Sequence, residues 1–335
     1  MKVLVTGATS GLGRNAVNYL LPQGIQVVAC GRNKIEGEIL TQLGAKFYAI
    51  ELADLSLADA KKMMSGCDAV WHCAALSSPW GKRQDFENIN HHATKTLADA
   101  AGELQISRFV HISTPAIYFN FTHQQNIVES TINRRFANQY ARTKYLAEIA
   151  IEQAVTRYPL TQYIILRPRG LFGPHDRVLL PRLLAQIKSR QGKLVLPAGG
   201  QNTFDLTYVG NVVHSMQLAT TKENLTSGAV YNITNQQPLP LKQTLQQLFN
   251  QLGMNYQIRS APYPVLYSVA ALMEGIAYLT GKEPLLTRYS LGAAYFTMTL
   301  DNQKAQQELG YYPIYNMEQA IHLTAQWLKQ QESAC

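Results

Sequence analysis

Short apolar runs alternate with longer amphipathic segments over the first half of the chain. The runs are nearly continuous, as in strands that a parallel sheet buries on both faces. They cover residues 2–6, 25–30, 46–50, 68–73, 108–113 and 162–167. Between them apolar residues recur at helical spacing, over the longest distances at about 86–103 and 136–158. This alternation predicts right-handed βαβ units and an α/β fold with a doubly wound parallel sheet.

The pattern changes after Pro168. Short apolar runs at 193–196 and 204–207 lie among Pro- and Gly-rich stretches, and helical periodicity dominates to the end. We therefore expect a dinucleotide-binding Rossmann domain in residues 1–168 and a smaller, mostly helical substrate lobe in residues 169–335. Part of 203–234 is expected to pack back on the sheet. The lobe should close over the carboxyl ends of the strands, where open α/β sheets bind ligands.

The most apolar stretch is residues 263–280. It is too short to span a membrane and carries Glu274 within it. A helix that is buried or faces the substrate is the first expectation. A helix that rests on a membrane surface is the alternative, which leaves peripheral membrane contact open.

Composition narrows the class of protein. The 335 residues are 46% hydrophobic and 16% charged, as in globular proteins, and the formal charge is +8. Lys and Arg are scattered, so no nucleic-acid groove is indicated. The four cysteines form no C-x-x-C pair, and we expect reduced thiols in a cytoplasmic protein. His91 and His92 are adjacent and point to different faces of a helix, so no metal site is expected.

A glycine-rich segment connects the first strand to the first helix. Gly7 would permit a tight turn, Gly11 would let the backbone approach a diphosphate, and Gly13 would let the helix pack closely on the strand. The diphosphate would then lie at the helix N-terminus, where unpaired N–H groups favour negative charge. The segment therefore predicts a dinucleotide site.

The end of the second strand bears on the choice of dinucleotide. An acidic residue there would hold the ribose 2′-hydroxyl of NAD, whereas this chain has Arg32 and no acidic residue before Glu36. A guanidinium suits a phosphate, so NADP(H) is favoured over NAD(H). The alternative is that Arg32 is a solvated loop residue.

Tyr140 and Lys144 stand four residues apart on a predicted helix, so they share one face. An ammonium beside a phenol favours the phenolate and would bring the phenol pKa toward neutral pH. Such a phenol can give a proton to a developing alkoxide. The preceding strand ends in Ser113-Thr114, where the sheet would present hydroxyls to the cofactor.

Together these motifs resemble the extended branch of the short-chain dehydrogenase/reductase superfamily over nearly the whole chain. The segments that carry the resemblance are TGATSGLG at 6–13, Asp54-Leu55, CAA at 73–75, Asn90, ISTPAIY at 112–118, YARTK at 140–144 and LRPRGLFGP at 166–174. One motif departs, because extended members usually show G-x-x-G-x-x-G. The glycine spacing here is that of the shorter members.

The resemblance implies a role for each motif. Tyr140 would be the acid/base, Thr114 would hydrogen-bond the substrate oxygen, and Lys144 would also bind the nicotinamide ribose; Ser113 would be structural. The cofactor-binding set becomes Gly7, Thr9, Ser10, Gly11, Leu12, Gly13, Arg32, Asp54, Leu55, Ala74, Ala75, Tyr140, Lys144 and Pro168.

Within the superfamily the latter half resembles the 3β-hydroxysteroid dehydrogenase-like group, and most of all the 2-alkyl-3-oxoalkanoate reductases of bacterial olefin synthesis. The segments are 166–176, 204–219, 278–287 and 308–313. They imply a hydrophobic acyl or polycyclic substrate. Candidate substrate residues are Ser77, Trp80, Arg169 and Phe172. One of the polar residues just past the sheet could hold a substrate carboxylate, with a surface or structural role as the alternative for each: Arg169, His175, Asp176, Arg177 and Arg182.

The leading hypothesis is an NADPH-dependent reductase of a ketone on a hydrophobic substrate, most simply a long-chain 2-alkyl-3-oxo acid. Three alternatives stay open: a hydroxysteroid or sterol dehydrogenase, a nucleotide-sugar epimerase or dehydratase, and a non-catalytic NADP-binding sensor. The superfamily commonly dimerises through the helices that here carry Asn90 and Tyr140, so the resemblance leaves a homodimer open.

Overall fold

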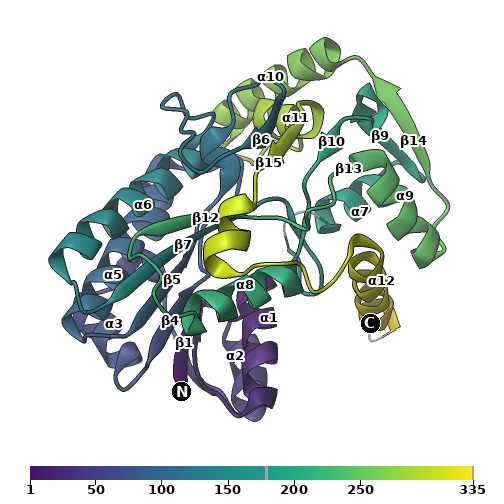
Figure 1. Cartoon of the computed structure of the whole chain (residues 1–335). Coiled ribbons are helices and arrows are strands. Elements are labelled where there is room, and N and C mark those ends of the chain that lie inside the picture. Colours follow the sequence, from purple (N-terminus) through teal and green to yellow (C-terminus); the bar gives the residue numbers. More distant parts are fainter. Residues whose placement is uncertain (178–179, 334–335) are drawn as a thin grey trace.

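The structure, a computed structural model, describes residues 1–177 and 180–333. Its centre is a seven-stranded sheet in the order β3-β2-β1-β4-β5-β7-β12, with every neighbouring pair parallel (Figure 1). The strands are β1 (Lys2–Thr6), β2 (Gln26–Gly31), β3 (Lys46–Ala49), β4 (Ala69–His72), β5 (Arg108–Ile112), β7 (Gln162–Pro168) and β12 (Ala229–Ile233). β1 lies in the middle of the sheet, and β2 and β3 are added on one side of it. The next strand, β4, lies on the other side of β1, so the strand order reverses between β1 and β4.

Helices cover both faces of this sheet. One face carries α1 (Gly11–Leu20), α2 (Lys34–Gln42) and α8 (Val209–Thr221), and the other carries α3 (Leu57–Met64), α5 (Ala93–Glu103) and α6 (Gln139–Arg157). The alternation of side chains along β1 sends Val3 and Val5 into the first layer and Leu4 into the second, all fully buried. The doubly wound fold expected from the sequence is confirmed.

Two expected helices begin at other residues. The helix expected from 86 starts as α4 (Arg83–Phe86) and passes through a π-helical segment, η3 (Glu87–His92), before α5. The helix expected from 136 begins as α6 at Gln139, because the Asn138 side chain accepts the Ala141 N–H at 2.9 Å and caps it. In both cases the changed boundary is the N-terminal end of a helix, which lies on the carboxyl side of the preceding strand of the sheet.

The remaining elements form the lobe and the connections. Larger helices are α7 (Leu180–Ser189), α9 (Leu241–Leu252), α10 (Tyr263–Thr280), α11 (Arg288–Tyr295) and α12 (Met317–Ser333). A four-stranded sheet joins β13 (Leu239–Pro240), β10 (Thr203–Phe204), β15 (Met298–Leu300) and β6 (Gln124–Ile127). Two further pairs are β14 (Gln257–Ala261) with β9 (Lys193–Pro197), and β11 (Thr207–Tyr208) with β8 (Leu171–Phe172). Short helical turns are η1 (Leu21–Gln23), η2 (Leu52–Asp54), η4 (Pro115–Tyr118), η5 (Ala198–Gly200) and η6 (Ala305–Leu309).

The single strand expected at 204–207 is two strands. β10 ends at Phe204 and β11 begins at Thr207, and the Asp205 carboxylate between them accepts the Leu300 N–H at 2.7 Å. A buried polar side chain that bonds a neighbouring backbone group thus interrupts the run.

The chain crosses between the large sheet and the lobe more than once. β12 comes from beyond residue 168 and pairs with β7 at the edge of the large sheet. β6, from residues 124–127, instead pairs with β15 in the lobe. Each part is therefore completed by a segment from the other side of residue 168.

The α10 helix has the expected bounds but not the expected burial. Of its residues only Ala270, Glu274 and Ala277 are buried, and most of its large apolar side chains face solvent. The expectation of a buried helix is wrong, because α10 is fully covered only along this narrow stripe, with a further contact at its start where Tyr263 stacks on Tyr295 at 4.2 Å. Among the described residues, no helix combines the length and apolar character needed to cross a membrane.

Candidate active site

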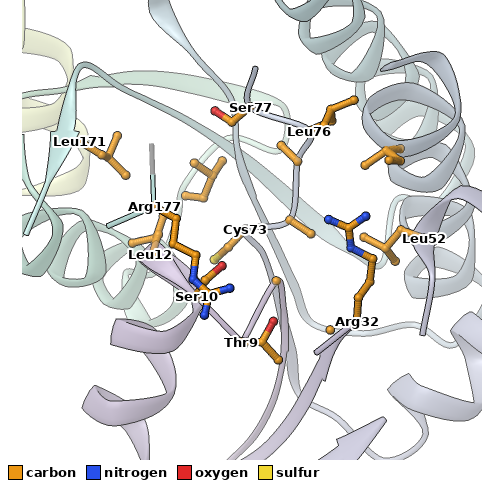
Figure 2. Close-up of a pocket in the computed structure, with 18 of the residues that line it drawn as sticks. Thr9, Ser10, Leu12, Arg32, Leu52, Cys73, Leu76, Ser77, Leu171 and Arg177 are labelled. Carbon is orange, nitrogen blue, oxygen red and sulfur yellow. The ribbon is translucent and has the colours of Figure 1, made fainter. Parts of the chain in front are cut away.

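A cavity of about 470 Å³ lies at the carboxyl ends of β1, β2, β4, β5 and β7. It sits where the strand order reverses between β1 and β4, which is where ligands of doubly wound sheets bind. Many residues named from the sequence line it: Gly7, Thr9, Ser10, Gly11, Leu12, Gly13, Arg32, Ala74, Ala75, Ser77, Thr114, Tyr140 and Pro168. Figure 2 shows part of this lining.

The glycine loop packs as closely as its sequence requires. Gly7 has φ +66°, and a Cβ there would come within 2.9 Å of Ala74 Cα. A Cβ on Gly13 would lie 2.3 Å from the Gly7 carbonyl oxygen, so no side chain fits between α1 and β1. A Cβ on Gly11 would meet nothing within 4 Å, which leaves the backbone open on that side.

The start of α1 meets the requirements of a bound diphosphate. The Ser10 side chain makes no capping hydrogen bond, and Ser10, Leu12 and Gly13 all line the cavity. An uncapped helix N-terminus offers N–H groups and positive potential to a phosphate. The residues present therefore fit a dinucleotide.

A loop from the lobe closes over the same glycines. The Gly11 N–H donates to the His175 carbonyl at 2.9 Å, and the Asn15 side chain donates to the Pro174 carbonyl at 2.8 Å. These bonds bring Arg177 to the wall of the cavity. Arg177, weighed from the sequence for a substrate carboxylate, thus lies beside the glycine loop.

Arg32 lines the opposite side. Its side chain is 68% exposed, and its Nη1 lies 3.4 Å from Glu51 Oε2. Figure 2 shows Arg32 and Arg177 entering the pocket from opposite sides. The structure does not bring Asp54 and Leu55 into the lining as expected, because the chain turns through η2 and presents Ile50, Glu51 and Leu52 instead.

Three hydroxyls meet at the inner end of the cavity. Tyr140 stands in the first turn of α6, and its hydroxyl is hydrogen-bonded with Thr114 and Ser77. Thr114 caps η4 by accepting the Ala116 N–H at 3.2 Å, which fixes its Oγ1. Burial raises the pKa of Tyr140, and the two hydroxyl bonds oppose that rise. The phenol therefore carries its proton at neutral pH.

Lys144 lies beneath the cleft and not in its lining. Its side chain is 1% exposed, and its Nζ donates to the Ile112 carbonyl at 2.6 Å and lies 3.0 Å from His111 Nε2. Burial lowers the pKa of Lys144 to about 7. The sequence predicted that this ammonium lowers the phenol pKa, and that is wrong for this arrangement: the ammonium faces β5, and burial governs Tyr140.

Two buried histidines under the cleft were missed from the sequence. His72 bridges Thr6 and Thr94 at 2.7 and 2.8 Å, and its ring lies 5.1 Å from that of His111. Burial and the nearby Lys144 lower the pKa of both imidazoles, so both are neutral. The available signal was a polar residue inside each of two apolar strand runs.

Asn90 ties the loop after β4 to α6. Its side chain accepts the Leu76 N–H at 2.7 Å and donates to the Leu76 carbonyl at 3.2 Å and to Thr143 Oγ1 at 3.1 Å. The π-helical segment turns Asn90 inward, and Leu76 directly precedes Ser77. These bonds hold the Ser77 hydroxyl opposite Tyr140.

Three of the four candidate substrate residues lie outside the cavity lining. Arg169 donates from Nε to the Met298 carbonyl at 2.9 Å, and Phe172 is buried against Tyr208. Trp80 packs its ring on Tyr278 of α10, with centroids 4.6 Å apart. The hydrogen bond to the Met298 carbonyl accounts for the position of the Arg169 side chain, and packing against Tyr208 accounts for that of Phe172.

Tyr289 on α11 was not singled out from the sequence. Burial raises its pKa, and the phenol of Tyr140 adds to the effect, so the two rings are neighbours. Its ring also meets Phe119 edge-on at 5.5 Å. Neither ring belongs to the cavity lining, and Phe119 is buried in an aromatic cluster of the core.

Comparison with known proteins adds independent evidence. The profile of the NAD dependent epimerase/dehydratase family matches residues 3–234. The uncharacterized protein YbjS of Escherichia coli is 44% identical, over 98% of each chain. A 4-hydroxy-2-methyl-3-oxo-4-farnesyl-3,4-dihydroquinoline-1-oxide ketoreductase of Stigmatella aurantiaca is 31% identical over 93% of this chain and 92% of its own.

A 2-alkyl-3-oxoalkanoate reductase of Stenotrophomonas maltophilia is 30% identical over 96% of this chain and 97% of its own. Among solved structures, UDP-glucuronic acid 4-epimerase of Bacillus cereus in complex with NAD superimposes with a TM-score of 0.77. That likeness covers 99% of each chain at 20% identity and concerns the fold. The resemblance recognised in the motifs is confirmed.

Proposed function

This chain belongs to the NAD dependent epimerase/dehydratase family, and from that premise we propose that it is an NADPH-dependent reductase of a ketone on a hydrophobic substrate. The substrate class that fits best is a long-chain 2-alkyl-3-oxo acid, which becomes the secondary alcohol. One observation carries the proposal: the hydroxyls of Tyr140, Thr114 and Ser77 lie together in the cavity that the glycine loop also lines.

The chain's contribution to the reaction is a proton and a fixed oxygen site. A bound nicotinamide supplies the hydride that adds to the carbonyl carbon. Thr114 and Tyr140 hydrogen-bond the carbonyl oxygen, and the Tyr140 hydroxyl gives it a proton as negative charge develops there. Burial supports this role because it keeps the phenol protonated until that charge appears. Lys144 lies buried beneath the same part of the cleft, bonded to the Ile112 carbonyl.

The hydrophobic substrate is supported from two directions. Leu76, Ile89 and Leu171 are apolar side chains of the cavity lining, which suits a substrate with an apolar chain. Two relatives that cover nearly the whole chain are named as reductases of oxo compounds that carry an alkyl or farnesyl group.

A substitution at Tyr140 tests the reaction. We expect Tyr140→Phe to lower kcat by at least about 100-fold with a 2-alkyl-3-oxo acid, because the proton donor is lost. Cofactor binding, followed by fluorescence titration, should persist. Tyr145→Phe on the same helix is the matched control, since that ring packs on Phe136 away from the cavity. Normal turnover by Tyr140→Phe would refute the role.

The preference for NADPH rests on Arg32. Its exposed guanidinium at the end of β2 suits the 2′-phosphate, and its contact with Glu51 is long. We expect Arg32→Ala to lower kcat/KM for NADPH roughly 10-fold or more and to change that for NADH little. Arg157→Ala, an exposed arginine at the far end of α6, is the control. Equal losses with both cofactors would contradict the assignment.

A further inference from the structure

The outward side of α10 is a continuous apolar stripe. Val265, Val269, Leu272, Ile276 and Leu279 follow one another at steps of four and three residues, so they share one helical face. Each is between 45% and 89% exposed. Figure 1 shows α10 at the outer edge of the molecule. We call this stripe the α10 face.

Two further large side chains are exposed near the C-terminal end of α10, outside the α10 face. Tyr278 and Leu285 are 78% and 85% exposed. Trp80, from the loop after β4, packs edge-on against Tyr278. Tyr278 stands four residues after Glu274, so it lies on a different side of the helix from the α10 face, and Trp80 contacts the helix on that side.

Charge is arranged around the α10 face and not within it. The one charged residue of the helix is Glu274, which is buried on the opposite side and accepts from the Arg288 N–H and Nε at 2.8 and 2.6 Å. The exposed charged residues shortly after Trp80 and Tyr278 in the chain are three basic and two acidic: Lys82, Arg83, Asp85, Lys282 and Glu283. The whole chain carries +8. An uncharged apolar stripe on a chain of net positive charge, with basic residues in excess nearby, complements an anionic lipid surface.

A second copy of the chain fits the α10 face less well. Steps of four and three also occur in coiled coils, but those set partner and register with charges at the positions that flank the stripe. The flanking positions here hold Leu266, Ser268, Met273 and Gly275, none of them charged. Nothing in the helix therefore specifies a helical partner, whereas a bilayer needs no register.

The α10 face adjoins the catalytic cleft. The loop that carries Ser77, which bonds Tyr140, continues to Ser78, whose hydroxyl contacts Glu283 at 3.4 Å, and then to Trp80. From the other direction, α11 follows α10 and brings Tyr289 beside Tyr140. A substrate that leaves a surface under α10 would therefore have a short path to the reacting groups.

We propose that the α10 face docks on the surface of an anionic lipid bilayer and lets the cleft take its ketone from that bilayer. The docking stands on the exposed stripe and the placement of charge. The statement about substrate rests on the proposed function, so the two need separate readouts.

Vesicle flotation tests the docking. The full chain should float with vesicles of phosphatidylethanolamine and phosphatidylglycerol and float less with vesicles of phosphatidylcholine alone. Leu272→Glu/Leu279→Glu should lower the floated fraction at least 10-fold, because two charges enter the stripe. Leu160→Glu/Ile35→Glu is the matched control, since both side chains are equally exposed apolar residues away from α10. Circular dichroism checks that each variant is folded.

The outcomes separate docking from chemistry. Docking is overturned if the full chain stays unbound to anionic vesicles, or if both double variants float equally well. It is also overturned if light scattering shows a dimer that only the α10 variant dissociates. With a short, water-soluble 3-oxo ester, the α10 variant should reduce ketone at the wild-type rate. With a long-chain ketone in vesicles it should be at least 10-fold slower. Flotation without reduction of any ketone would refute the proposed function and leave the docking intact.

Discussion

At the scale of single residues, the unusual feature is a lysine whose side chain is buried beneath the cleft. Lys144 has two partners, the Ile112 carbonyl and His111, and neither is an anion. His111 is itself neutral, and its Nδ1 is buried without a partner among the described residues. Burial therefore outweighs the hydrogen bonds and the more distant Glu148, and it lowers the Lys144 pKa to about 7.

This shift makes stability depend on pH in a defined window. In the unfolded chain the ammonium regains a pKa of ~10.4, so between pH 7 and 10 the unfolded state binds more protons and wild-type stability rises with pH. Below pH 7 both states are protonated and the penalty is complete. We expect the unfolding free energy of wild type minus that of Lys144→Met to increase by roughly 2 kcal/mol between pH ~7 and ~9.

Urea unfolding at several pH values measures that difference. Lost hydrogen bonds in the variant add an offset that does not vary with pH, so the slope is the diagnostic quantity. Lys193→Met, an exposed lysine on β9, controls for the loss of one positive charge. A difference that stays constant from pH ~7 to ~9 would show that the buried ammonium does not titrate there.

At the scale of elements, the strand–turn–helix unit at the N-terminus was predictable because its constraints are local. Gly7 and Gly13 are required by backbone contacts within the unit and with Ala74. The place of the two hydroxyls was also predictable, because Thr114 comes just after the end of a strand and Tyr140 lies on a helix, four residues before Lys144. The direction of the Lys144 side chain was not predictable, because it depends on a carbonyl and a histidine of β5, to which helical spacing gives no access.

Two glycine-to-alanine substitutions separate the cost of a steric clash from the gain in helix propensity. In Gly13→Ala the new Cβ would lie 2.3 Å from the Gly7 carbonyl oxygen, which must push α1 away from β1. We expect a loss of about 1–3 kcal/mol and a marked loss of cofactor affinity. Gly275→Ala in α10 meets nothing within 4 Å and should gain about 0.5–1 kcal/mol. Thermal unfolding and cofactor titration measure both.

The contrast between the two variants is the test, because each adds the same methyl group to a helix. Similar changes in stability from both would show that α1 tolerates separation from β1. Retained cofactor affinity in Gly13→Ala would further show that the diphosphate does not depend on this close approach.

At the scale of the whole molecule, a break in sequence pattern is not a break in structure. The periodicity changes at residue 168, yet β12 completes the large sheet and β6 completes the lobe sheet. The return of part of 203–234 to the sheet is expected from the sequence and is made by β12, whereas the pairing of β6 with β15 leaves no local signal. The exposure of α10 was equally hidden, since composition cannot distinguish an apolar helix in a core from one on a surface.

The exchanged strands predict that the molecule unfolds as one unit. Asn232 of β12 accepts from the Tyr118 hydroxyl at 2.8 Å and donates to the Ile127 carbonyl of β6 at 2.9 Å, so one buried side chain links both exchanged segments. A chain cut after residue 168 would leave β7 as an unpaired edge and bury polar groups without partners. We expect fragment 1–168 to be unfolded or aggregated, and the full chain to show coincident fluorescence and circular-dichroism transitions that NADPH moves together. Two resolved transitions, of which NADPH shifts one, would instead show that the sheet is stable without β12.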